Sequence, residues 1–286
     1  MSFSSDVKAE LAKQCKKSRH CQLAELAGIL ELAGRERGGI LTLDSENPCL
    51  LQKYALLMRR LFSIEAEQPL SREDSQRVLA ALKWEDAVFE KEAADGLLLL
   101  QACCRRAFIR GAFMAAGSIS DPSKSYHFEI VCRTKPQALQ LQSLMAGFSA
   151  EAGIVERKGH PVLYLKEGSQ IVDMLNVMEA SVSLMNLENI RILKEMRNSV
   201  NRKVNCETAN IHKTVDAAVR QLEDIRRIQE TRGLSSLPES LQEVARLRLE
   251  YPDATLAELG ARLLPPVGKS GVNHRLHRIS DIAAEL

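Results

Sequence analysis

Polar residues near the end of the chain have the types and the spacing with the clearest chemistry. Val272, Leu276 and Ile279 recur at helical spacing and predict one buried helix face. The other positions of this helix carry hydrogen-bonding side chains, namely Asn273, His274, Arg275, His277 and Arg278. Asparagine and arginine form bidentate hydrogen bonds with adenine and guanine edges, which favours a contact with DNA. The alternative is a small helical domain with an ordinary solvated face.

Three short helices between residues 236 and 286 are expected to position these side chains. Ser236 with Glu239, and Thr255 with Glu258, have capping-box spacing and predict the starts of the first two helices. Two helices joined by a tight break, the second with a hydrogen-bonding outer face, indicate a helix-turn-helix. The expected DNA-contacting residues are Thr255, Lys269, Ser270, Gly271, Asn273, His274, Arg275, His277 and Arg278.

The seven cysteines show no spacing that is typical of a metal site. Cys15, His20 and Cys21 lie close together in the chain but lack a second ligand pair at zinc-site spacing. His274 and His277 are one helical turn apart and also lack a partner pair. We therefore expect no metal and no other cofactor, and reduced thiols that are mostly buried.

The charge of the chain is nearly balanced at +2, and its basic excess lies towards the end. Residues 1–180 contain 23 basic and 23 acidic residues, whereas residues 191–232 contain ten basic and six acidic residues. Attraction to nucleic acid is therefore expected in the C-terminal third. With no apolar run long enough to cross a bilayer and no signal core, we expect a soluble, cytoplasmic, nucleoid-associated protein without membrane contact.

Two glycine pairs reveal an internal repeat in the first part of the chain. Gly28 and Gly34 are repeated as Gly111 and Gly117, 83 residues later. Downstream, the pattern Phe-Ser-x-Glu-Ala recurs at residues 62–66 and 148–152. Two matches in the same order indicate duplication. The glycines are expected to let two helix backbones approach closely, because they have no side chain.

Helices and strands are predicted to alternate in both copies, which gives an α+β fold class. Helices are expected over residues 5–15, 20–33, 48–61, 98–116 and 136–152, with a further helix capped by Ser71. Strands are expected over residues 40–43, 64–67, 85–91, 126–132, 154–158 and 162–166.

The segment Leu26–Gly34 resembles the signature helix of LAGLIDADG homing endonucleases, and Ile109–Gly117 resembles it more loosely. The resemblance implies two α/β halves about a pseudo-twofold axis, with the signature helices crossing at the centre. In that family the eighth motif position is an acid that binds the catalytic metal. Ala33 and Ala116 stand there in this chain, and Glu31 matches the structural acid of the sixth position. Two methyl groups cannot hold Mg²⁺, so nuclease chemistry is expected to be lost.

The whole chain resembles the WhiA transcriptional regulators of Gram-positive bacteria. The resemblance rests on residues 2–8, 201–210 and 269–276. It implies a sequence-specific regulator that binds double-stranded DNA and is linked to sporulation, cell division and chromosome segregation. We expect a degenerate LAGLIDADG-like domain at 1–180, with repeats at about 20–95 and 98–178. A helical linker is expected at 181–233 and an all-α helix-turn-helix domain at 234–286.

Three alternatives remain open at this point. A metal-dependent endonuclease of the LAGLIDADG class would need other acids, for instance Glu31 with Asp121 or Glu129. The first domain, with no net charge, would alternatively bind a protein such as another regulator. The linker has two interpretations as well, a solvated face or a contact with DNA or a domain; its candidate contact residues are Asn201, Arg202, Lys203, Asn205 and Asn210.

Overall fold

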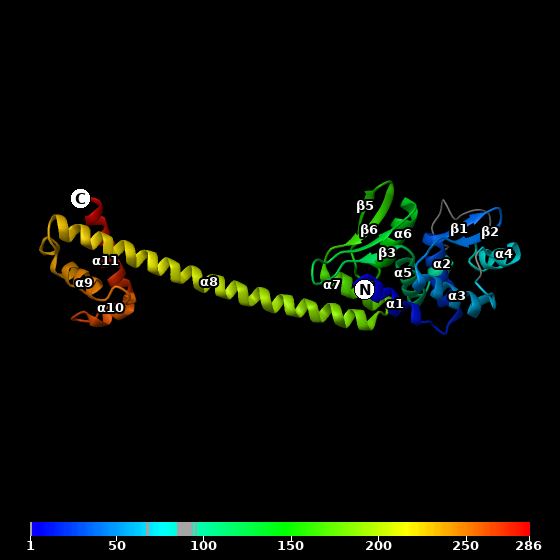
Figure 1. The fold of residues 1–286 in the computed structure, drawn as a ribbon, viewed down its shortest axis with the longest axis horizontal. Helices are drawn as coiled ribbons and strands as arrows, with labels where there is room; N and C mark the ends of the chain where they lie inside the picture. Colours follow the sequence, from blue (N-terminus) through cyan, green and yellow to red (C-terminus); the bar gives the residue numbers. More distant parts are fainter. Residues whose placement is uncertain (1, 67–68, 85–93, 95) are drawn as a thin grey trace. The chain divides into compact units, whose positions relative to one another are not determined.

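The structure is a computed structural model that describes residues 2–66, 69–84, 94 and 96–286 (Figure 1). The chain forms two compact units, Met1–Glu195 and Met196–Leu286. Helix α8 (Ser181–Thr231) contributes residues to both units. Among the described residues, no helix combines the length and the apolar character needed to cross a membrane.

Two helices of equal length form the centre of the first unit. Helices α2 (Arg19–Ala33) and α5 (Ala102–Ala116) begin and end 83 residues apart, the same spacing as the repeated glycines. Gly34 and Gly117 cap their C-terminal ends. Most of α2 is buried on every side, so it shows little amphipathic periodicity. The predicted helix over 20–33 and the duplication with central signature helices are confirmed.

The close approach expected from the repeated glycines is confirmed. A Cβ atom on Gly28 would press against the carbonyl oxygen of Phe108 and lie 2.9 Å from the Ala112 nitrogen. A Cβ atom on Gly111 would press against the carbonyl oxygen of Glu25 and lie 3.1 Å from the Ile29 nitrogen. These contacts are related by the 83-residue repeat, so each helix presents its glycine to the same backbone atoms of the other.

Each central helix leads directly into an antiparallel sheet. After α2, strands β1 (Gly34–Arg37) and β2 (Ile40–Leu43) form a hairpin. After α5, β3 (Gly117–Ile119), β4 (Phe128–Val131), β5 (Gly153–Arg157) and β6 (His160–Leu165) form a sheet of order β3-β4-β6-β5. Leu163 and Leu165 of β6 are buried in the core.

The remaining helices of the first unit pack around this centre. They are α1 (Phe3–Lys13), α3 (Pro48–Phe62), α4 (Arg72–Ala81), the 3₁₀ turn η1 (Gly96–Leu99), α6 (Lys135–Ala146), α7 (Gly168–Met178) and the start of α8. Ser71 caps α4 as predicted, because its hydroxyl accepts a hydrogen bond from the Asp74 nitrogen. The predicted helix over 48–61 is confirmed as α3.

Several predicted element boundaries are wrong. Helix α1 spans Phe3–Lys13 rather than 5–15, with Ser2 as its N-cap. Helix α5 begins at Ala102 rather than 98, because η1 and a bend precede it. Helix α6 ends at Ala146 rather than 152. Residues 64–66 form no strand, and the strand predicted over 85–91 lies outside the described residues.

The short strands β1 and β3 were not predicted. Gly38 and Gly39 form the turn of the β1–β2 hairpin. Their φ values of 61° and 79° lie in the left-handed region that glycine tolerates.

A buried ion network joins several helices of the first unit. The Glu25 carboxylate is fully buried and accepts hydrogen bonds from Arg110 at 2.8 and 3.1 Å. The Lys53 ammonium lies 2.8 Å from Glu25 and is also fully buried. Arg110 further contacts Glu179 at 3.1 Å. The network therefore links α2, α3 and α5 with the end of α7, and its charges are paired inside the protein.

The second unit is helical. The 3₁₀ turn η2 (Leu234–Ser236), α9 (Glu239–Glu250), α10 (Leu256–Arg262) and α11 (Lys269–Ala284) share a core with Ile225 and Ile228 of α8. The Thr255–Glu258 capping box is confirmed. The Ser236 capping box is wrong, because the Ser236 hydroxyl donates to the Gly233 carbonyl in η2 and Pro238 occupies the N-cap.

Candidate nucleic-acid interface

One face of α11 is buried in the core of the second unit. Val272, Leu276, Ile279 and Ala283 are each at most 1% exposed, as the helical spacing predicts. Burial of this stripe holds the helix in one rotational setting. The opposite face is therefore presented to solvent.

The polar residues of α11 are divided by this setting. Asn273, His274, His277 and Arg278 are exposed. Arg275 is only half-buried rather than fully outward, which corrects the expectation for this residue. Because each helical residue turns by about 100°, the position after His274 returns towards the buried stripe.

Two grooves flank α11 and receive different side chains. Arg275 lines one groove together with Glu239 and Glu243 of α9. Asn273 lines the other together with Lys269 and Thr255. The structure thus brings together three predicted contact residues, Thr255, Lys269 and Asn273, and places Arg275 on the opposite flank beside acidic side chains.

The connection between α10 and α11 is close-packed. A Cβ atom on Gly260 of α10 would collide with the carbonyl oxygen of Val267. The Val267 nitrogen donates to the Gly260 carbonyl at 2.9 Å, which fastens the connection to α10. Sequence reasoning did not single out Gly260, although a glycine inside a short amphipathic helix is a signal of close approach.

The N-terminus of α11 is open to solvent. Gly268 is the N-cap without a side-chain capping bond, and Lys269 and Ser270 in the first turn are exposed. Gly271 is half-buried against the Val267 side chain. Free N–H groups and the positive end of the helix dipole suit a phosphate here.

The candidate contact residues of α8 are all solvent-exposed: Asn201, Arg202, Lys203, Asn205 and Asn210. The Arg202 Nε donates to the Asn198 carbonyl at 3.3 Å, one turn earlier in the helix. They lie within residues 195–217 of α8, which are all exposed, so these side chains are accessible to a partner.

The catalytic end of a LAGLIDADG helix pair carries alanines in this chain. Ala33 and Ala116 are the last residues of α2 and α5. Glu31, two residues before Ala33, is buried and accepts a hydrogen bond from the Ala94 nitrogen at 3.1 Å. Burial raises the pKa of Glu31 to about 8, so it is largely protonated at pH 7.

The other two acids considered for a nuclease have local partners. Glu129 lies 3.1 Å from His127 and 3.2 Å from Arg157. Asp121 accepts a hydrogen bond from the Ser123 nitrogen at 2.9 Å. Among the described residues, no group of three or more potential metal ligands includes Glu31, Asp121 or Glu129.

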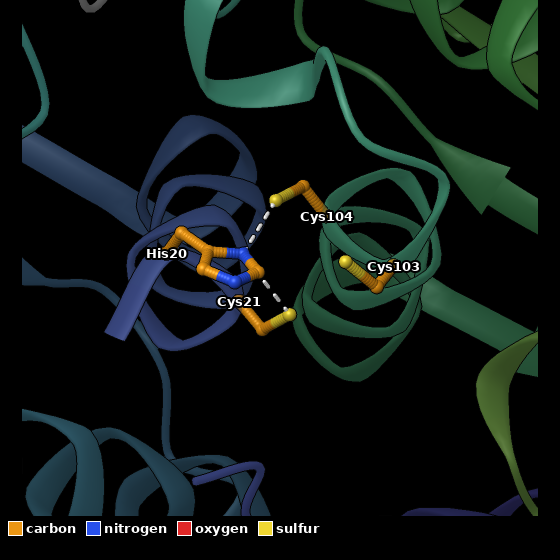
Figure 2. Close-up of side chains that lie close together, drawn as sticks. All are labelled: His20, Cys21, Cys103 and Cys104. Carbon is orange, nitrogen blue, oxygen red and sulfur yellow. Dashed lines mark hydrogen bonds between the residues drawn. The ribbon is translucent and has the colours of Figure 1, made fainter. Parts of the chain in front are cut away.

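The first turns of α2 and α5 bring together four residues that sequence reasoning did not combine. His20, Cys21, Cys103 and Cys104 have ligand atoms that all lie within 4.8 Å of one another (Figure 2). Burial and the neighbouring thiols raise the pKa of Cys21 to about 12. The signal for this cluster was the 83-residue offset of the glycines, which also relates His20 to Cys103 and Cys21 to Cys104.

The cysteines are only partly buried, which corrects the expectation that most are. Cys21, Cys104 and Cys132 are buried, whereas Cys103 and Cys206 are exposed. All seven are free thiols in the structure.

Comparison with known proteins identifies related sequences over the full chain. Residues 105–197 match the family model of the WhiA LAGLIDADG-like domain, and residues 200–283 match that of the WhiA C-terminal HTH domain. "Probable cell division protein WhiA" of Lachnoclostridium phytofermentans is 47% identical, covering 99% of this chain and 98% of that protein. The protein of the same name from Alkaliphilus oremlandii is 48% identical, covering 100% and 98%.

A solved structure has the same fold. Full-length DUF199/WhiA from Thermatoga maritima aligns with a TM-score of 0.61 at 25% identity, covering 100% of this chain and 99% of that chain. Its alignment includes both units of the present structure.

Proposed function

The chain belongs to the WhiA family, and on that premise we propose that it is a sequence-specific DNA-binding transcriptional regulator without nuclease activity. The observation that carries this proposal is α11, whose apolar stripe is buried while Asn273, His274, His277 and Arg278 remain exposed. The matched HTH domain supports DNA as the partner of this face. We assign residues 234–286 as the reading domain and residues 1–180 as a LAGLIDADG-like domain.

The proposed contact places the first turns of α11 in the major groove. Asn273 and Arg278 supply hydrogen bonds of the type that distinguish adenine and guanine. Lys269 and Ser270 at the helix start contact phosphate, with Thr255 on the same side of the helix as Lys269. Arg275 reaches a base edge only from the flank that it shares with Glu239 and Glu243.

The absence of nuclease activity is supported by the ends of α2 and α5. Metal-dependent cleavage needs carboxylates that converge on a phosphate. Ala33 and Ala116 offer none, and Glu31 is buried with a raised pKa. The first unit keeps the helix pair of a nuclease fold, and the buried charges of Glu25, Lys53 and Arg110 are paired with one another.

The names of the relatives support the proposed biological role. Their printed name associates them with cell division. We propose that this chain regulates genes of cell division, sporulation and chromosome segregation at the nucleoid. The LAGLIDADG-like domain is proposed to bind another regulator protein. Its basic and acidic residues are equal in number, whereas a domain that binds DNA is normally rich in basic residues.

The decisive experiment selects a DNA target from random sequences with the full chain and then measures competition between target and random DNA. Asn273→Ala should weaken target binding by roughly 5- to 150-fold, the equivalent of a lost bidentate contact of about 1–3 kcal/mol, and spare random DNA. Arg60→Ala, which removes an exposed arginine from α3, is the control and should change neither. Unchanged target preference in folded Asn273→Ala protein would show that α11 is not the reader.

The same preparation tests for nuclease activity. Supercoiled and linear DNA incubated with Mg²⁺ or Mn²⁺ should stay intact. Metal-dependent nicking that co-purifies with the chain and persists in Asn273→Ala protein would instead support the endonuclease alternative.

A further inference from the structure

The cluster of His20, Cys21, Cys103 and Cys104 lies at corresponding positions of the two central helices. His20 and Cys21 are the second and third residues of α2, and Cys103 and Cys104 are the second and third residues of α5. The 83-residue repeat therefore relates one pair to the other, as it relates Gly28 to Gly111. Each repeat contributes two potential metal ligands, and the crossing of the helices brings the pairs together (Figure 2).

We propose that His20, Cys21, Cys103 and Cys104 bind one zinc ion as a structural site that joins the first turns of α2 and α5. Three thiolates and one imidazole form a ligand set that is typical of structural zinc sites. Soft thiolate ligands select zinc over the hard cations that a LAGLIDADG nuclease uses. This inference concerns the opposite end of the helix pair from Ala33 and Ala116 and is independent of the proposed DNA contact.

The distances fit a single tetrahedral ion. Zinc bonds of about 2.0–2.3 Å place neighbouring ligand atoms roughly 3.5–3.8 Å apart. The His20 Nδ1 lies 3.1 Å from the Cys104 Sγ and 3.4 Å from the Cys21 Sγ, and all four ligand atoms are within 4.8 Å. Binding would draw the most widely separated ligand atoms together by about 1 Å.

The ligands lie at the N-terminal ends of α2 and α5, where the helix dipoles are positive. Ser18 and Gln101, the N-caps of α2 and α5, make no side-chain capping hydrogen bond. The Gln101 Oε1 instead accepts a hydrogen bond from the Cys103 Sγ at 3.4 Å, so Cys103 would exchange this contact for the ion. A divalent cation supplies the remaining charge that three neighbouring thiolates require.

Burial distinguishes a structural role from a catalytic one. Cys21 and Cys104 are buried, whereas His20 and Cys103 are exposed, so an ion can enter from one side and then be enclosed by protein ligands. Four protein ligands leave no open position for a substrate. The ion would thus hold the two repeats together where their central helices begin.

The test uses the full chain, purified under reducing conditions without a metal-affinity tag from zinc-supplemented cells. Elemental analysis should find about one zinc per chain. After chelation, Co²⁺ should give intense visible d–d bands and a thiolate charge-transfer band, the signature of tetrahedral sulfur coordination. Added zinc should raise the melting temperature, because a ligand that binds the folded state stabilises it.

Variants at the exposed ligands separate binding from folding. Cys103→Ser and His20→Asn should fold, yet lose stoichiometric zinc, the cobalt bands and the zinc-dependent thermal shift. Cys132→Ser, at a buried thiol outside the cluster, and Cys206→Ser, at an exposed thiol of α8, should retain all three.

Four results would overturn the proposal. They are a fully reduced chain that binds no zinc, cobalt spectra without thiolate bands, zinc retained equally by Cys103→Ser, and a disulfide within the cluster that persists in reductant and prevents zinc uptake. None of these readouts depends on DNA, so failure here is distinct from failure of the regulator proposal.

Discussion

Polar side chains are buried and paired on the central helices of the first unit, but are exposed on the last helix of the second unit. Helix α5 buries Arg110 and pairs it with Glu25 and Glu179. Helix α11 buries only its apolar stripe and leaves Asn273 and Arg278 exposed. Charge that is paired inside a protein maintains the fold, whereas charge with a free face is available to a partner. Helices α2 and α5 are therefore expected to maintain the fold, and α11 is the helix that we propose to recognise DNA.

The largest expected effect concerns the close approach of α2 and α5. Gly111→Val places a side chain against the backbone of Glu25 and Ile29, which cannot move without separating the helices. We expect a cost above about 3 kcal/mol and loss of the folded first unit. Thermal melting and soluble yield are the measurements. Gly96→Ala, at a position with open space, should be tolerated. Equal melting temperatures of the two variants would show that the glycine contact is not needed for the fold.

Removal of the buried acid should be nearly as damaging. Glu25→Gln leaves Lys53 and Arg110 buried with an uncompensated positive charge, at a cost of about 3–5 kcal/mol. Urea unfolding should show the loss. Glu65→Gln, which removes an exposed ion pair with Arg59, should cost less than about 1 kcal/mol. A stable Glu25→Gln protein would mean that the network is not needed for the fold.

The buried stripe of α11 provides the next test. Leu276→Ala should create a cavity in the core of the second unit and cost about 2–5 kcal/mol. The same truncation at exposed Leu264 should have little effect on stability. Melting followed by a probe in the second unit measures the difference; similar stability of the two variants would contradict the orientation given to α11.

The smallest effect is expected at the start of α11. Lys269→Ala should weaken binding to target and random DNA alike and reduce the salt slope by about one unit, as loss of one phosphate contact would. A titration of binding against salt concentration measures this. A loss of binding to the target alone would instead show that Lys269 contacts a base rather than a phosphate.

The sequence predicted those features that depend on periodicity or on a backbone requirement. The stripe Val272, Leu276 and Ile279 and the close approach at Gly28 and Gly111 are of this kind. Each is encoded by residues near one another in the chain, or by a glycine that no other residue can replace. The prediction that Arg275 points outward was wrong. One residue after the exposed His274, the helix has turned by about 100°, which brings Arg275 back towards the buried face.

Features that depend on tertiary contacts could not be predicted in this way. Strand β1 has the sequence Gly-Arg-Glu-Arg, which has no alternation of apolar and polar residues. Glu25, Lys53 and Arg110 are far apart in the chain, and each alone is typical of a solvated face. Cys103 and Cys104 lie 83 residues after their partners, beyond the spacings of familiar zinc motifs.

The reciprocal glycine contact also restricts how this fold can change over generations. Gly28 faces backbone atoms of α5, and Gly111 faces backbone atoms of α2. When a core residue grows, a neighbouring side chain can shrink to compensate, but a carbonyl oxygen is common to every amino acid and offers no such compensation. Neither glycine can therefore be rescued by a second substitution across the contact, so both copies of the repeat are tied to the same residue even as their other positions diverge.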